Sequence, residues 1–95
     1  MQTDQEKFLN LKTLPGRLKA EEAAWFLGFS VHEIPLLVSR GILKPLGRPA
    51  QNAPKYFALA NLEELQRDVK WLSKASEAIC QHWQERKKRE PVGSL

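Results

Sequence analysis

Apolar residues recur at helical spacing in two short stretches between residues 20 and 40. The first stretch predicts a helix over residues 20–27, whose apolar positions are Ala20, Ala23, Ala24, Phe26 and Leu27. Gly28 stands just past its end, where the backbone often needs a positive φ. In the second stretch, Ser30 and Glu33 form an S-x-x-E capping box, which predicts a new helix from Val31 to a stop at Gly41. The chain therefore predicts a helix, a tight turn and a second helix.

Three weaker patterns organise the rest of the chain. Residues 1–16 form a lead-in with a weak Thr3–Glu6 capping box, whose apolar residues can dock on a core: Phe8, Leu9, Leu11 and Leu14. Two β-like runs, Leu43–Leu46 and Lys55–Ala58, flank a loop rich in Pro, Gly and Asn, and predict a two-stranded wing. We therefore divide the chain into a lead-in (1–16), a central domain (17–67), a last helix (68–90) and a flexible tail (91–95).

Two cap residues predict the helices that follow the wing. Asn61 can cap a short helix over residues 62–67, and Asp68 can cap a longer one over residues 69–89. At 1.5 Å per residue this last helix is roughly 30 Å long. The expected fold class is mainly α, a winged helix-turn-helix with a two-stranded wing and a long C-terminal helix.

The composition excludes several classes of function but does not identify one. With 95 residues and a formal net charge of +4, the chain is one small domain that leans toward anionic partners. Cys80 is the single cysteine, and no apolar run or signal peptide indicates a membrane, so we expect a cytoplasmic protein. No nucleophile–base arrangement or phosphate loop is visible. His32 and His82 lie far apart in sequence, so we expect no enzyme, no cofactor and no metal site.

The segment from Arg17 to Leu65 resembles the MerR-like and excisionase-like winged helix-turn-helix domains. The matching positions are Glu22-Ala23-Ala24, Leu27-Gly28, Ser30, Ile34, Gly41-Ile42-Leu43 and Tyr56-Phe57. The resemblance implies a domain that binds double-stranded DNA, with the second helix in the major groove and the wing against the flanking backbone. It implies a transcriptional regulator or a recombination accessory factor. Many members of these families pair through a helix after the wing.

The second helix departs from that family in the residues it offers to bases. Pro35 stands where the family often has arginine, and the first two turns lack the Arg, Lys, Asn or Gln that make bidentate base contacts. The basic groups lie elsewhere: residues 17–58 hold six Lys or Arg against three Glu, a net of +3. We expect DNA contacts from Lys19, Val31, His32, Ser39, Arg40, Lys44, Arg48 and Lys55. The alternative is a protein-interaction module that kept the fold and lost base reading.

The last helix carries an apolar stripe close to heptad spacing, formed by Leu72, Ile79 and Trp83. Two readings of this stripe stay open. The helix folds back on Phe8, Leu9 and Leu11, or a second copy of the chain covers it in a homodimer.

Overall fold

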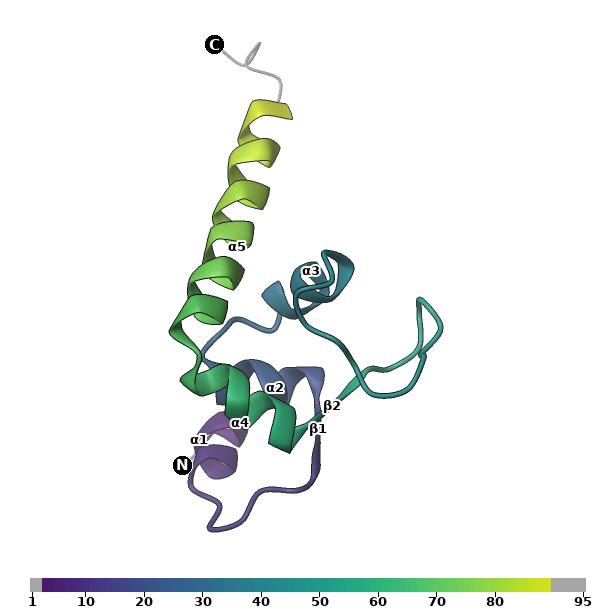
Figure 1. Ribbon diagram of the computed structural model, residues 1–95. Helices are drawn as coiled ribbons and strands as arrows, with labels where there is room; N and C mark the ends of the chain where they lie inside the picture. Colours follow the sequence, from purple (N-terminus) through teal and green to yellow (C-terminus); the bar gives the residue numbers. More distant parts are fainter. Residues whose placement is uncertain (1–2, 90–95) are drawn as a thin grey trace.

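The computed structural model describes residues 3–89, which form a mainly helical domain with one small sheet (Figure 1). The elements in chain order are α1 (Asp4–Leu9), β1 (Arg17–Lys19), α2 (Ala20–Leu27), α3 (Glu33–Ser39), β2 (Tyr56–Ala58), α4 (Leu59–Arg67) and α5 (Val69–Arg89). The expected mainly α class, the two-stranded sheet and the long last helix are confirmed at this level. The tail expected at residues 91–95 lies outside the described residues.

Helix α2 spans the eight residues that the sequence predicts for it. At its start, the Glu22 carboxylate accepts a hydrogen bond from the Lys19 backbone N–H at 3.0 Å. At its end, Gly28 adopts a left-handed φ of 90°, and its amide and that of Phe29 both donate to the Ala24 carbonyl. A non-glycine residue is strained at this φ, so Gly28 fixes the direction of the turn that leads to α3.

Helix α3 begins at Glu33, two residues later than the predicted start at Val31. The Glu33 side chain returns to the Ser30 amide at 2.7 Å, as the capping box predicts. The Ser30 hydroxyl instead accepts from the His32 amide at 3.2 Å, which holds Val31 and His32 in a turn. Because of the later start, Pro35 lies in the first turn of α3, where backbone amides have no partner within the helix, and it costs α3 no hydrogen bond.

The sheet joins β1 to β2, and the predicted pairing of Leu43–Leu46 with Lys55–Ala58 is wrong. The strands are antiparallel, with Arg17 opposite Ala58, Leu18 opposite Phe57 and Lys19 opposite Tyr56. The segment 43–46 forms no strand, because Pro45 has no N–H to donate and Gly47 turns the chain away with a φ of 69°. A single hydrogen bond, from the Leu46 amide to the Tyr56 carbonyl at 2.7 Å, holds this segment beside β2.

Of the two helices after β2, α5 begins where the sequence predicts and α4 begins earlier than predicted. Helix α4 begins at Leu59 directly after the strand, so Asn61 lies inside the helix and does not cap it. Helix α5 has the predicted bounds, and the Asp68 carboxylate caps it by accepting from the Trp71 amide at 3.1 Å. The indole N–H of Trp71 donates to the Ile42 carbonyl at 3.0 Å and ties the start of α5 to the segment after α3.

The core lies where α2, α3, α4 and the sheet meet. Its largest fully buried side chains are Phe57, Leu18, Ile34, Leu37, Leu43 and Leu62. Helix α5 packs against α3 and α4, and Ala75 and Ile79 join the same cluster. Helix α1 packs on α2 through Phe8, whose ring lies 5.7 Å from that of Trp25. Of the other apolar residues in the lead-in, Leu14 is half-buried, but Leu9 and Leu11 are exposed and do not dock as expected.

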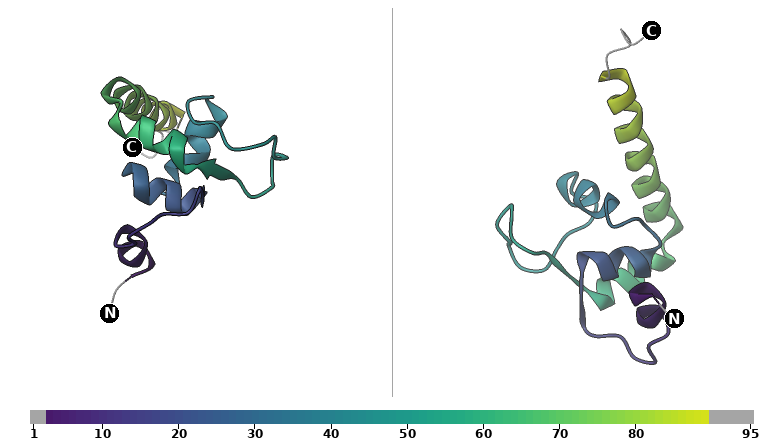
Figure 2. Two further views of the ribbon diagram at one scale, coloured as in Figure 1. Left: turned by 60° about the horizontal axis from the view of Figure 1, so that its bottom comes forward. Right: turned by 180° about the vertical axis from the view of Figure 1, so that it is seen from behind.

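Two parts of the chain project from this body in different directions. The second half of α5 extends beyond the other elements, and the loop between α3 and β2 projects on the opposite side of α3 (Figures 1 and 2). Within the described residues, no helix is both long enough and apolar enough to cross a membrane.

Candidate nucleic-acid interface

Helix α3 is held between α2 and α5, and it exposes only a narrow face. Ile34 and Leu37 point into the core and are fully buried. The solvent side carries Pro35 and Ser39, and the turn before the helix exposes Val31 and His32. This face contains few polar groups, because the Ser39 hydroxyl already donates to the Leu36 carbonyl at 2.9 Å. It is therefore a mainly apolar surface with one free imidazole.

A groove of about 450 Å³ runs along α3 and opens toward the projecting loop. We call it the α3 groove. Its lining residues come from the start of α2, from α3 and from the loop: Ala20, Ile34, Pro35, Val38, Ser39, Gln51 and Lys55. Two of the residues expected at the DNA interface, Ser39 and Lys55, thus come together here although 16 positions separate them.

The loop beside the α3 groove carries most of the free positive charge near α3. Lys44 and Arg48 are exposed, and Lys55 is half-buried with its amine donating to the Gln51 carbonyl at 3.0 Å. Among the basic side chains that the structure describes, only Arg40 lies within 4.0 Å of a carboxylate oxygen. The three loop cations are therefore available to an anion from solvent.

Arg40 has a different environment from the loop cations. Its guanidinium lies 3.6 Å from the Glu85 carboxylate of α5. It also lines a shallow pocket with α5 residues, including Lys74 and Glu77, and takes no part in the α3 groove. Because both partners are partly exposed, the ion pair is weak and easily exchanged, but it directs Arg40 toward α5.

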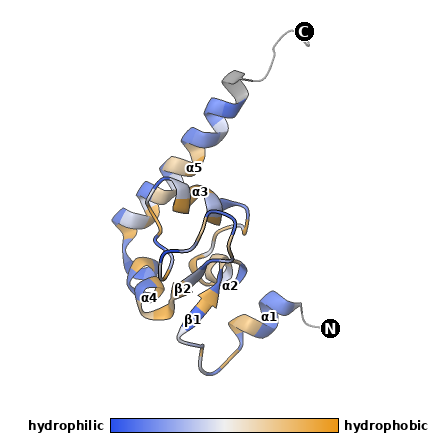
Figure 3. Ribbon diagram, turned by 90° about the vertical axis from the view of Figure 1, so that its right-hand side faces the viewer, coloured by the Kyte–Doolittle hydropathy of each residue, from blue (hydrophilic) through white to orange (hydrophobic). Residues whose placement is uncertain are grey.

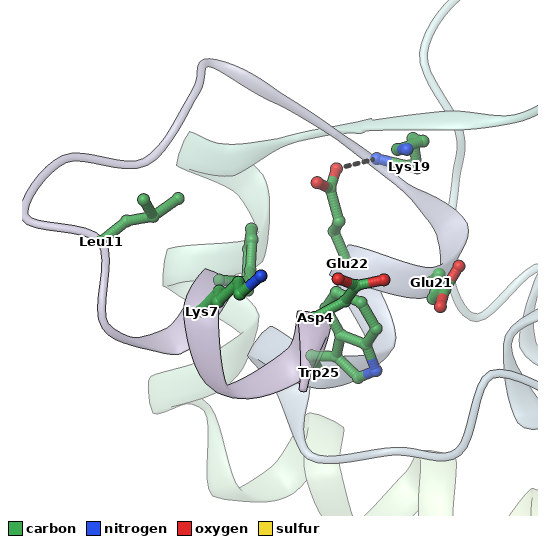
Figure 4. A pocket seen from close by; sticks show the side chains of 8 residues that line it. Asp4, Lys7, Leu11, Lys19, Glu21, Glu22 and Trp25 are labelled. Carbon is green, nitrogen blue, oxygen red and sulfur yellow. Dashed lines mark hydrogen bonds between the residues drawn. The ribbon is translucent and has the colours of Figure 1, made fainter. Parts of the chain in front are cut away.

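Lys19 is also separated from the α3 groove. It lines a pocket of about 280 Å³ between α1 and α2, together with Asp4, Glu21 and Glu22 (Figure 4). Lys7 also lines this pocket, and three carboxylates against two lysines make it a poor place for a phosphate. Lys19 therefore belongs to a different surface from the residues near α3.

The three residues expected at a dimer interface are not presented together. Ile79 is 8% exposed and packs in the chain's own core, so it is not available to a second copy. Leu72 is half-buried, and Trp83 is 52% exposed on the projecting half of α5, with the Arg86 guanidinium 5.5 Å from its ring. The outer half of α5 is otherwise mainly hydrophilic (Figure 3). The homodimer stays a prediction, which now depends on Trp83 rather than on an apolar stripe.

Sequence reasoning did not select Gln51 and Val38 as site residues. Gln51 belongs to the loop, and the fold brings it opposite α3, where its backbone carbonyl also anchors Lys55. Val38 is half-buried on α3 and forms part of the groove wall. No local sequence pattern marks either residue, because the groove that both line exists only where the loop folds back toward α3.

Comparison with known proteins gives no further guide to this surface. No family model, no curated protein and no solved structure matches the chain. Within the described residues, no group of three or more His, Cys, Asp or Glu side chains is arranged to hold a metal ion.

Proposed function

We propose that this chain is a small DNA-binding protein with a winged helix-turn-helix fold, acting as a transcriptional regulator or a recombination accessory factor. In this proposal α2 and α3 form the helix-turn-helix, α3 enters the major groove, and the loop over residues 44–55 takes the place of the wing. The observation that carries the proposal is that the exposed face of α3 lies beside a loop whose three cations have no carboxylate partner within the described residues.

Electrostatics support this arrangement. Lys44, Arg48 and Lys55 lie within 12 residues of one another on one loop, and residues 17–58 have a net charge of +3. Cations on a projecting loop can follow a phosphate backbone while a neighbouring helix occupies the groove. Lys and Arg contacts to phosphate supply most of the affinity of sequence-independent DNA binding. Such binding does not require the base-reading residues that α3 lacks.

The apolar α3 groove favours a second candidate function, a protein-interaction module. Pro35 and Val38 give the groove an apolar wall that could hold a partner's side chains. We rank this candidate second, because an apolar groove alone does not explain three cations without a carboxylate partner on the neighbouring loop.

A salt titration of duplex binding tests the proposed function. The full chain should bind a 20-base-pair mixed-sequence duplex at 0.05 M salt, measured by fluorescence anisotropy. A plot of log affinity against log salt concentration should be linear with a slope of about −0.9 for each phosphate contact. With the three loop cations in contact with phosphates, a slope of about −2.7 is expected. A folded sample that binds no duplex at low salt would replace the proposal by the interaction module.

A further inference from the structure

The exposed face of α3 differs chemically from the loop beside it. Between Val31 and Ser39 the exposed side chains are Val31, His32, Pro35 and Ser39. Val31 in the turn before α3 and Pro35 in the first turn of the helix are both apolar and exposed. The Ser39 hydroxyl donates a hydrogen bond to the Leu36 carbonyl, and the Arg40 guanidinium forms an ion pair with Glu85. Among the four exposed side chains between Val31 and Ser39, His32 is therefore the only one with a free hydrogen-bond donor, while the guanidinium of Arg40 is directed toward α5.

A face of this kind restricts the bases it can cover. Wherever Val31 or Pro35 lies against a base edge, it excludes water and offers no hydrogen bond, so a covered donor or acceptor is left without a partner. In the major groove, G·C pairs present hydrogen-bond acceptors on guanine and a hydrogen-bond donor on cytosine, and no methyl group. Thymine alone among the four bases adds an apolar group there, the C5 methyl.

We propose, resting on the proposed function, that α3 selects DNA through the C5 methyl groups of thymine, with Val31 and Pro35 as the contact residues. The loop cations Lys44, Arg48 and Lys55 hold the phosphate backbone beside α3, and this charge complementarity makes duplex DNA the occupant of the apolar face. Specificity then comes from methyl burial rather than from bidentate hydrogen bonds. The bases recognised are the thymines that lie against these two side chains.

The experiment compares two 16-base-pair duplexes of alternating sequence, one built from A·T pairs and the other from A·U pairs. Deoxyuridine differs from thymidine only by the missing C5 methyl group. Burial of one methyl group corresponds to roughly a fourfold change in affinity. With both Val31 and Pro35 in contact, the full chain should bind the A·T duplex roughly 15-fold more tightly than the A·U duplex at the same salt concentration.

A matched pair of variants assigns the effect to α3. Val31→Ser removes the apolar contact and should lower the ratio of A·T to A·U affinity by roughly fourfold. Val69→Ser makes the same chemical change at a site that is 76% exposed at the start of α5, and should leave the ratio unchanged. Circular dichroism confirms that both variants are folded.

Different results would overturn the recognition of thymine methyl groups and the proposed DNA binding. Equal binding of the A·T and A·U duplexes by the full chain would overturn recognition of thymine methyl groups while leaving DNA binding in place. A ratio that Val31→Ser and Val69→Ser lower equally would also overturn the assignment to α3. Absence of binding to either duplex at 0.05 M salt would overturn the proposed function itself.

Discussion

Replacing Phe57 by alanine is expected to destabilise the fold by about 3–5 kcal/mol. Phe57 is fully buried, and it lies opposite Leu18 in the sheet at the centre of the core. Truncation of its ring removes contacts with both strands and leaves a cavity that so small a domain cannot refill. Because the total stability of a domain is about 5–15 kcal/mol, this loss is a large part of it. Urea denaturation followed by circular dichroism measures the change.

A surface substitution provides the control for that experiment. Leu9→Ala also removes an apolar side chain, but Leu9 is 53% exposed on α1, so the free energy of unfolding should change by less than about 0.5 kcal/mol. A loss below about 1 kcal/mol for Phe57→Ala would mean that the sheet does not form the centre of the core.

The double variant Lys44→Ala/Arg48→Ala is expected to show the largest change in DNA binding. Each lost phosphate contact lowers the steepness of the salt dependence by about 0.9, so two lost contacts lower it by about 1.8. At 0.05 M salt the same relation gives a loss of affinity on the order of 100-fold. Both side chains are exposed, so the variant should keep the stability of the original chain. Fluorescence anisotropy at several salt concentrations measures both quantities.

The control for this variant removes the same charge from other surfaces. Lys12 lies in the loop after α1, and Lys70 lies in the first turn of α5. Lys12→Ala/Lys70→Ala lowers the net charge equally but should change the slope by less than half as much. Equal effects of the two double variants would mean that net charge alone, and not the loop, attracts DNA.

The elements that the sequence predicted well are those defined by local signals. The limits of α2 depend on the apolar spacing within it and on Gly28, whose left-handed conformation is a property of one residue. The start of α5 depends on Asp68, which caps the amide three residues away. Such short-range chemistry can be read from sequence because both partners lie in the same segment.

The errors arose where a distant partner decides the structure. The strand Tyr56–Ala58 pairs with Arg17–Lys19, about 40 residues earlier, so the β-like run near Leu43 suggested the wrong partner. Ile79 looked like an interface residue because its apolar neighbours on α5 were visible, whereas the helix that covers it was not. The approach of Arg40 to Glu85 was likewise not visible in the sequence, because only the packing of α3 on α5 brings the two side chains together, and the expected DNA contact of Arg40 stays a prediction.

In the candidate site, too, single-residue properties could be predicted from sequence and contacts between distant segments could not. The basic residues of the loop were identified from sequence, because charge is a property of single residues. Their separation from Lys19, and the approach of Gln51 to α3, required the folded chain. The start of α3 at Glu33, which places Pro35 in the first turn where proline is tolerated, was also visible only in the folded chain.

In the proposed function, α3 and the neighbouring loop together contact duplex DNA. Mapping of backbone amide chemical shifts tests this most directly, with the ¹⁵N-labelled chain titrated with a 16-base-pair A·T duplex at low salt. The largest shifts should fall on residues 31–40 and 44–55, with little change in α1 and in the outer half of α5. Shifts confined to α5 or to the pocket between α1 and α2, or no shifts at all, would contradict it.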